Sequence, residues 1–457
     1  MIFSSALAMA RAIRDKKISS RELVALHLER IDEVNPKLNA VVCLAAEGAL
    51  EEARAADARS AEGALHGVPI TLKDSFDTEG IVSTGGTAGR KDYVPDADAV
   101  AVARLRAAGA IVLGKTNTPE MTIASECCTT NDLFGRTNNP YDVTRTTSGS
   151  SGGAAAIVAA GGAPLDLGTD TGGSIRDPAH HCGIVGVKPT SGRVPKTGHI
   201  ISHGLGPLDY LTQIGPMARY VEDLAMALPL ICGPDGVDPG VVDMPLGDPA
   251  KVELSELRVA MYTDNGACVP RNDVAQVVEA AGQVVAAAKA EVRPAVPEAI
   301  RDAGALGHEI RSADGHAWLR RLLERAGSDV QSSSVAWMLK DSKPVTAEAF
   351  SRILEKVEAF RSRMLQFVAD YDAIICPVVP WPALPHDATV RDDFDNWSNL
   401  GAYNLTGWPG AVVRAGTSAE GLPIGVQIVG KPWREDVVLA LAAHVERELG
   451  GYRRPEL

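Results

Sequence analysis

Apolar and polar positions follow two rhythms along the chain, and each rhythm predicts one kind of element. Short apolar runs favour buried strands, and they occur at residues 67–73, 110–113, 163–167, 183–188, 257–261, 371–377, 411–413 and 424–429. Apolar residues that recur every three or four positions predict helices, at residues 1–17, 19–35, 45–61, 98–108, 220–230, 273–290, 347–370 and 436–448. Because strands and helices alternate throughout, the sequence predicts an α/β fold, layered α/β/α around a central mixed sheet that helices flank.

One stretch, residues 146–176, combines glycines, serines and a core-like apolar run. Residues 149–153 read GSSGG, residues 168–174 read GTDTGGS, and residues 154–160 between them contain only Ala, Ile and Val. This run predicts a short helix buried on every side. Glycines next to serines let backbone N–H groups approach a ligand with no side chain in the way. We interpret the stretch as an active site, because a linker would not carry a core-like run.

The texture of the chain changes from about residue 295 to residue 343, where it becomes polar, helical and less regular. We therefore predict one domain over residues 1–457, with a helical cap or insertion at about 295–343. This segment contains Trp318 and Trp337, and the loop at 380–400 contains Trp381 and Trp397. We expect both segments to line the entrance of a pocket, where apolar and aromatic side chains are typical.

Composition excludes several classes of protein. The net charge is -13 with no basic tract, which argues against nucleic acid or an anionic membrane as a partner. The seven cysteines are widely spread without a CxxC pair, so we expect neither a disulfide framework nor structural zinc. The sequence contains no stretch of about 18 apolar residues, so we expect no membrane span. We expect a cytoplasmic protein, and the sequence indicates no oligomeric state.

Two formal motifs are better explained without a ligand. Residues 109–116 read GAIVLGKT and match a phosphate-binding loop, but residues 110–113 are strand-like and Pro119 stands where the following helix would start. The sequence His180-His181-Cys182 is a weak metal site, because adjacent residues on a helix point about 100° apart. We expect local packing there, and no metal.

Lys73 ends the apolar run at residues 67–73 and is a candidate base. A serine hydroxyl is a poor nucleophile until a base removes its proton, and a buried neutral lysine can do this. The sequence offers no obvious histidine for that task. Spacing alone leaves a second reading open, in which Lys73 lies at the surface and pairs with Asp74.

Taken together, residues 67–74, 149–153 and 168–176 resemble the amidase signature family. Residues 114–120, 183–190, 213–219, 404–409 and 421–427 also look like segments of that family. The resemblance covers most of the chain and is weakest from about 235 to 370. Members of this family hydrolyse amides with a Ser–cis-Ser–Lys triad, so the resemblance favours Lys73 as a base.

The resemblance implies a role for each matching residue. Ser174 would be the nucleophile, Ser150 the bridging serine after a cis peptide bond, and Lys73 the general base. The oxyanion hole would be formed by the backbone N–H groups of Thr171, Gly172, Gly173 and Ser174, and the supporting residues would be Ser151, Asp170 and Arg176. The chain departs from the family pattern at Ser148, at Ala154 and in the polar residues 177–182, which puts the pocket shape in doubt more than the chemistry.

These residues imply a serine amidase that cleaves linear C–N acyl bonds of small, partly apolar or aryl amides through an acyl-enzyme on Ser174. No metal or organic cofactor is implied, and the expected partner is a small-molecule amide or carbamate. A carbamate (urethane) hydrolase on the same triad is one alternative. An amidotransferase subunit that works with partner chains is another.

Overall fold

The computed structural model describes residues 1–124, 128–329, 332–340, 342–388 and 394–457. Its centre is an eight-stranded mixed sheet with the order β10-β9-β11-β13-β12-β7-β8-β6. Strands β10, β9 and β11 are parallel, and the other neighbours are antiparallel. The strands are β6 (Leu165–Asp170), β7 (Val185–Lys188), β8 (Gln213–Ala218), β9 (Arg258–Met261), β10 (Glu291–Pro294), β11 (Ala373–Pro377), β12 (Gly410–Thr417) and β13 (Pro423–Gly430).

A second sheet contains three strands in the order β1-β3-β2. These are β1 (Val41–Leu44), β2 (Pro69–Lys73) and β3 (Ile111–Thr116). The Thr71 hydroxyl of β2 donates a hydrogen bond of 2.6 Å to Asp166 of β6, which ties the two sheets together. Residues 111–116 are a strand, so they cannot form the loop that phosphate binding needs. A small hairpin consists of β4 (Thr130–Asn131) and β5 (Gly135–Arg136).

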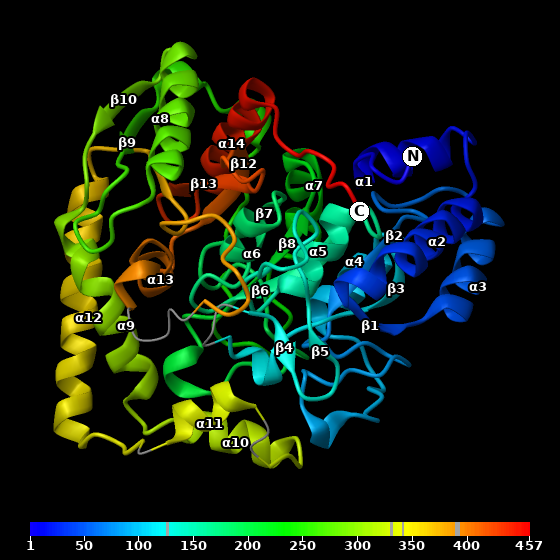
Figure 1. Cartoon of the computed structure of the whole chain (residues 1–457), viewed down its shortest axis with the longest axis horizontal. Coiled ribbons are helices and arrows are strands. Elements are labelled where there is room, and N and C mark those ends of the chain that lie inside the picture. The colour runs from blue at the N-terminus through cyan, green and yellow to red at the C-terminus, as the bar shows by residue number, and fades with distance from the viewer. Residues whose placement is uncertain (125–127, 330–331, 341, 389–393) are drawn as a thin grey trace.

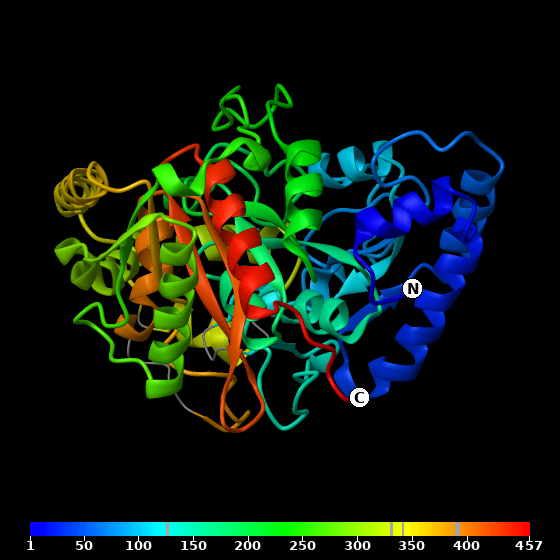
Figure 2. The ribbon, with the colours of Figure 1, turned by 90° about the horizontal axis from the view of Figure 1, so that it is seen from above.

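Helices cover both faces of the central sheet (Figures 1 and 2). They are α1 (Ala6–Arg14), α2 (Ser20–Leu38), α3 (Ala46–Asp57), α4 (Val100–Ala107), α5 (Gly152–Ala160), α6 (Arg176–His181), α7 (Val221–Ile231), α8 (Asn272–Ala287), α9 (Ala303–Ser312), α10 (Ala317–Arg325), α11 (Ser333–Leu339), α12 (Ala347–Val368), α13 (Ser398–Leu405) and α14 (Glu435–Leu449). None of the helices in these described ranges is long and apolar enough to cross a bilayer.

Alternation along the strands explains the two helical layers. Val259 and Ile375 pack in a core with α7, α8 and α14, whereas Ala260 and Ile374 pack in a second core with α9, α10 and α12. Neighbouring side chains of a strand point to opposite faces, so β9 and β11 each contribute to both cores. The α/β/α layering expected from the sequence is confirmed.

Local signals place most helix ends close to their expected positions. Ser19 forms the expected capping box with Glu22, and its helix α2 continues to Leu38, beyond the expected end. All nine residues of α5 are buried, as the run of small apolar residues predicts. Strands β1, β8 and β10 were not expected. Polar residues, glycine or proline interrupt β8 and β10, whereas β1, VVCL, is a run of only four apolar residues between two helices.

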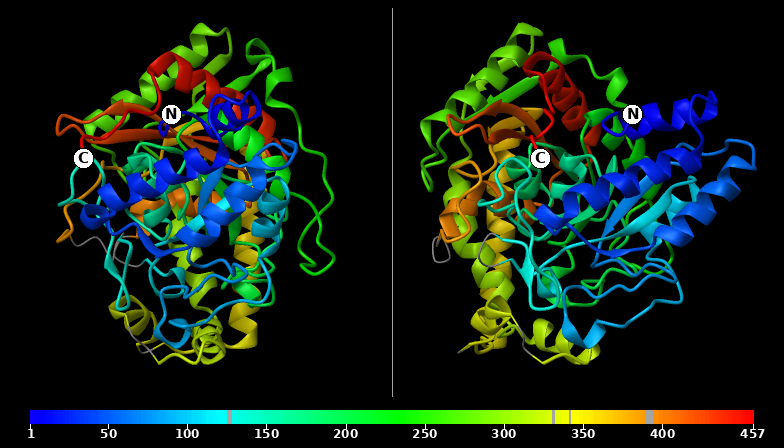
Figure 3. Two further views of the ribbon diagram at one scale, coloured as in Figure 1. Left: turned by 90° about the vertical axis from the view of Figure 1, so that its right-hand side faces the viewer. Right: turned by 45° about the vertical axis from the view of Figure 1, so that its right-hand side comes forward.

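The described residues between 295 and 343 include a short 3-10 helix (Glu298–Asp302) and the helices α9, α10 and α11. Ile310 and Leu319 of this segment share a core with Phe360 of the long helix α12. In Figures 1 and 3, α10 and α11 lie at the end of the molecule opposite α14. The other 3-10 helices are short turns at Ala88–Arg90, Glu120–Thr122, Gly206–Leu208, Pro249–Lys251, Leu254–Glu256 and Phe394–Trp397.

Candidate active site

Lys73 lies at the end of β2 and is completely buried. Its ammonium nitrogen Nζ donates to the hydroxyl oxygens of Ser150 at 2.6 Å, Thr169 at 2.8 Å and Ser151 at 3.1 Å. Asp74 is engaged elsewhere, since it accepts hydrogen bonds from the backbone N–H and the hydroxyl of Thr84. The reading of Lys73 as a surface lysine paired with Asp74 is therefore wrong.

The surroundings of Lys73 favour its neutral form. Burial lowers the pKa of Lys73 to about 7, although the negative charges of Asp170 and Asp166 act in the opposite direction. Burial also raises the pKa of Asp166 to about 6, and hydrogen bonds from Thr71 and Thr116 limit that rise. Because three hydroxyl groups and no carboxylate contact Nζ in the described structure, a neutral amine is accessible near pH 7.

The two serines beside Lys73 lead into helix α5. The peptide bond between Gly149 and Ser150 is cis, as the resemblance implied. A Cβ atom on Gly153 would lie 2.4 Å from the backbone nitrogen of Asn117, so the start of α5 has no room for a side chain there. This close packing holds Ser150 and Ser151 against the end of β2.

Asp170 and Arg176 brace the loop that follows β6. Both side chains are fully buried, and Arg176 Nε lies 2.9 Å from Asp170 Oδ2. The Asp170 carboxylate also accepts the backbone N–H groups of Gly173 at 2.8 Å and Ile175 at 3.2 Å. Burial alone would raise the pKa of Asp170, but the guanidinium of Arg176 outweighs it and holds that pKa far below its usual range. The Asp170 carboxylate thus shapes the loop and does not face the pocket.

Ser174 lies in this loop, half-buried, and lines a pocket. Its hydroxyl has no hydrogen-bond partner among the described residues, and its backbone oxygen accepts from the Ser151 N–H at 3.3 Å. The structure thus brings Lys73, Ser150 and Ser151 into direct contact. It places Ser174 in the adjacent loop, without a hydrogen bond to Ser150.

Four backbone N–H groups of this loop were expected to form an oxyanion hole. Those of Thr171, Gly172 and Ser174 have no protein acceptor in the described ranges. Gly173 differs from that expectation, because its N–H already donates to Asp170. Three donors therefore remain for a substrate oxygen in this state.

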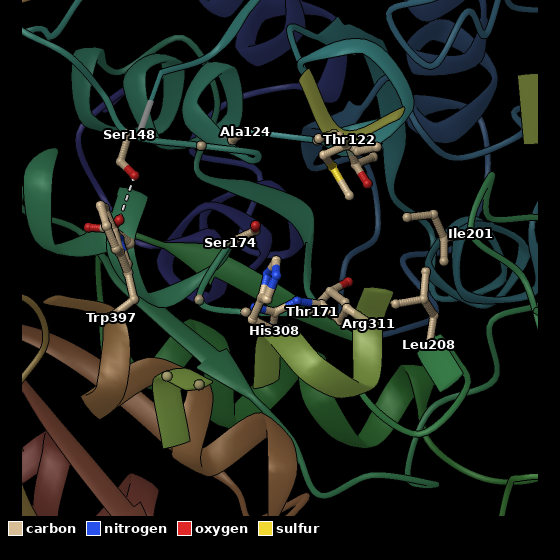
Figure 4. Close-up of a pocket in the computed structure, with 18 of the residues that line it drawn as sticks. Thr122, Ala124, Ser148, Thr171, Ser174, Ile201, Leu208, His308, Arg311 and Trp397 are labelled. Carbon is tan, nitrogen blue, oxygen red and sulfur yellow. Dashed lines mark hydrogen bonds between the residues drawn. The ribbon is translucent and has the colours of Figure 1, made fainter. Parts of the chain in front are cut away.

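The pocket beside Ser174 has a volume of about 250 Å³ and a largely apolar lining (Figure 4). Its apolar lining residues are Ile123, Ala124, Ile201, Leu208, Ala303, Trp318, Trp337, Met338 and Trp397. Three of these are tryptophans from the segments expected at the entrance. The fourth, Trp381, packs edge-on against Trp397 with ring centroids 6.2 Å apart.

Several polar groups of the pocket were missed by sequence reasoning. Arg311 and His308 come from α9, and Asp177 from α6 accepts a hydrogen bond of 2.7 Å from the Ser148 hydroxyl. Burial raises the pKa of Asp177 to about 6. Two signals in the sequence pointed to the segments of these residues, without naming them: the polar character of residues 177–182 and the expected place of residues 295–343 at the pocket entrance.

His180 is a buried packing residue, as expected. Its ring nitrogens lie 3.2 Å and 3.0 Å from the carbonyl oxygens of Gly425 and Trp381. Burial lowers the pKa of His180 to about 4. Among the described residues, no group of three or more His, Cys, Asp or Glu side chains is placed to hold a metal ion.

Comparison with known proteins agrees with this geometry. The model of the Amidase family matches residues 22–439. The chain belongs to the amidase family. It is 36% identical to the indoleacetamide hydrolase of Bradyrhizobium diazoefficiens, over 98% of this chain and 86% of that protein. It is 33% identical to a subunit of the glutamyl-tRNA(Gln) amidotransferase of Geobacter sp. (strain M21), over 95% of each chain.

Solved structures show the same fold. The 6-aminohexanoate cyclic dimer hydrolase complexed with substrate superimposes with a TM-score of 0.88 at 30% identity, covering 100% of this chain and 99% of that chain. The chain is therefore an amidase-family enzyme with an amidase-signature fold, and it acts on amides.

Proposed function

We propose that this amidase hydrolyses linear amides through an acyl-enzyme on Ser174, with Lys73 as the general base and Ser150 as the relay between them. One observation carries the proposal: a fully buried lysine whose pKa is about 7 donates to Ser150 at 2.6 Å beside a pocket that opens on Ser174. A base poised near the working pH is what general base catalysis requires.

In the first step, neutral Lys73 takes the hydroxyl proton of Ser150, while Ser150 takes that of Ser174. The Ser174 oxygen attacks the amide carbon, and the developing oxyanion accepts hydrogen bonds from the N–H groups of Thr171, Gly172 and Ser174. Removing one such donor typically costs about 3 kcal/mol of barrier. The Ser150–Ser174 hydrogen bond is expected to form when substrate binds, since catalytic contacts are often open in the free enzyme.

The same relay then returns a proton to the leaving nitrogen, and the C–N bond breaks. Water, deprotonated through the relay, attacks the acyl-enzyme and releases the acid and free Ser174. Ser151 and Thr169 hold the Lys73 nitrogen in place, and the Asp170–Arg176 pair holds the loop. No step in this scheme calls for a cofactor.

The substrate class follows from the pocket. A small pocket with tryptophan, leucine and isoleucine in its lining suits a partly apolar or aryl amide. The names of two relatives, an indoleacetamide hydrolase and a 6-aminohexanoate cyclic dimer hydrolase, are consistent with compact amides.

We regard residues 1–457 as one amidase domain, with residues 295–343 as the cap that supplies part of the pocket lining. We propose that the protein is located in the cytoplasm.

Two alternatives use the same residues. A carbamate presents a similar carbonyl and leaving amine, so a urethane-cleaving activity fits the same triad. A role within a multi-chain amidotransferase is favoured by the similarity to the glutamyl-tRNA(Gln) amidotransferase chain. In that second case the isolated chain would be nearly inactive on simple amides.

The test combines turnover with trapping of the intermediate. The chain alone is assayed on matched amides, anilides, carbamates and esters, and a slow substrate is then quenched and digested for mass spectrometry. We expect an acyl adduct on the peptide that contains Ser174, absent in Ser174→Ala and present in the exposed control Ser60→Ala. An adduct elsewhere, or wild-type turnover by Ser174→Ala, would disprove the proposal.

A further inference from the structure

Arg311 belongs to α9, and its guanidinium group lies at the pocket, beside the loop that follows β6 and contains Ser174. In Figure 4 it lies on the side of Ser174 where Ile201 and Leu208 are found. A Cβ atom on Gly172 would lie 3.8 Å from Arg311 Nη1, and one on Gly307 would lie 3.3 Å from it. The guanidinium therefore lies between α9 and the loop, in space that two glycines leave open.

The Arg311 guanidinium has no hydrogen bond and no ion pair with any described residue. The buried arginines of the core behave differently. Arg193 pairs with Glu435 at 2.7 Å, and Arg219 donates to four backbone carbonyls, including that of Ala163 at 2.7 Å. Arg311 is half-buried. Its cation loses part of its water without gaining a partner, which is unfavourable.

The rest of Arg311 is held in place. Its backbone oxygen accepts a hydrogen bond of 3.1 Å from the indole nitrogen of Trp318, and its neighbour Ile310 is buried in the core shared with α12. Burial lowers the pKa of Arg311, and among the described residues the group that acts against this is Tyr210, which is not a carboxylate. The fold thus positions a partly desolvated cation in the pocket that Ser174 also lines, with no counter-ion from the described part of the chain.

We propose that Arg311 is a specificity-determining residue that binds a carboxylate carried by the amide substrate. This inference rests on the proposed function and narrows it to amides that bear a carboxylate within reach of the scissile bond. The planar guanidinium matches a carboxylate with two parallel hydrogen bonds. The apolar side chains of Ile201 and Leu208 on the same side leave little competition for that contact.

The other side of the pocket fixes the orientation of such a substrate. Asp177 lies there with Ser148 and Trp397, and its carboxylate repels a second carboxylate whenever it is ionised. A substrate carboxylate therefore points toward Arg311, and the remaining apolar part of the molecule lies toward Trp397.

The experiment uses two matched pairs of chromogenic anilides. On the acyl side, the 4-nitroanilide of succinic acid is compared with that of 4-oxopentanoic acid, in which a methyl ketone replaces the carboxylate. On the amine side, N-butyryl-4-aminobenzoate is compared with N-butyryl-4-aminoacetophenone. The variants are Arg311→Met, Arg311→Lys and the exposed control Arg325→Met, which changes an arginine at the end of α10 away from the pocket.

In at least one pair, we expect the wild type and Arg325→Met to prefer the carboxylate in kcat/KM by about 10- to 100-fold, the size of a hydrogen bond to a charged group. Arg311→Met should abolish that preference by raising KM for the carboxylate member of the pair, and Arg311→Lys should restore part of the preference. The inference is overturned if neither pair shows a preference, or if Arg311→Met keeps it. If no substrate depends on Ser174, the proposed function fails instead.

Discussion

The wall of the pocket and the buried groups next to it are built on different principles. The buried groups, which we call the floor, are Lys73, Ser150, Ser151, Thr169 and Asp170, and their side chains form hydrogen bonds or ion pairs with other side chains. The wall, which consists of Ile201, Leu208, Arg311, Trp318, Trp337 and Trp397, is mostly apolar and comes from distant segments. The floor is thus suited to fixing proton positions, and the wall to selecting the shape and charge of a ligand.

Two buried lysines show why the floor is specialised. Among the described residues, Lys73 Nζ donates only to hydroxyl groups, whereas Lys115 on the neighbouring strand β3 donates to the carbonyl of Phe76 as well as to two hydroxyl groups, those of Thr78 and Ser83, and lies near the charge of Asp74. Burial lowers the pKa of Lys73 to about 7 and that of Lys115 to about 8. Burial and a hydroxyl contact alone do not make a base: the hydroxyl must also lie next to the loop of Ser174, as those of Ser150 and Ser151 do.

The largest effect is expected from Lys73→Met. Without a base, kcat/KM on an amide should fall by about 10⁴-fold, the scale seen when one member of a catalytic group is removed. The matched change Lys115→Met should lower the melting temperature but keep most of the activity of each folded molecule. Equal losses of activity in the two variants would contradict the distinction between the lysines.

A second change in the floor, Asp170→Asn, tests the buried ion pair between Asp170 and Arg176. It leaves Arg176 buried without its counter-ion, which should lower the free energy of unfolding by about 3 kcal/mol. Urea denaturation followed by circular dichroism measures this change. Glu348→Gln, which removes an exposed partner of Arg352, is the control and should produce no measurable change. A stable Asp170→Asn protein would show that the pair does not brace the loop.

The pH dependence sharpens the assignment of Lys73. Because the neutral amine is the base, kcat/KM should rise about tenfold from pH 6 to pH 8, with an apparent pKa near 7. The unfolded lysine keeps its proton up to about pH 10.4, so between pH 7 and that value the unfolded chain binds more protons. The contribution of Lys73 to the free energy of unfolding therefore increases with pH in this window. Urea titrations of the wild type and Lys73→Met should diverge there, and parallel curves would contradict the assignment.

The smallest effect is expected from the wall. Trp337 lines the pocket but is 38% exposed. Trp337→Ala should raise KM for an aryl amide by about 3- to 10-fold through lost apolar contact, while kcat stays nearly constant. The corresponding alkyl amide is the control and should change less. A fall in kcat for both substrates would show that the wall also positions the reacting groups.

Much of the fold could be predicted because its signals are local. The capping box at Ser19, the buried helix α5 and the strand that ends at Lys73 are all encoded by neighbouring residues. Strand β10 was missed because it lies at the sheet edge with a mostly exposed sequence, EVRP, and exists through its pairing with β9. Strand β8 was missed because Gly215 and Pro216 interrupt its apolar run.

Residue types and short spacings are sufficient to predict most strands and helices, the amidase resemblance and the residues that carry it. The contacts of Lys73 with Ser150, 77 residues later, and with Thr169, 96 residues later, exist only in the folded chain. The fold also directs the Gly173 N–H to Asp170 and places Arg311 beside Gly172, with no hydrogen bond or ion pair to any described residue. Such contacts depend on packing between distant segments, and no local pattern in the chain records them.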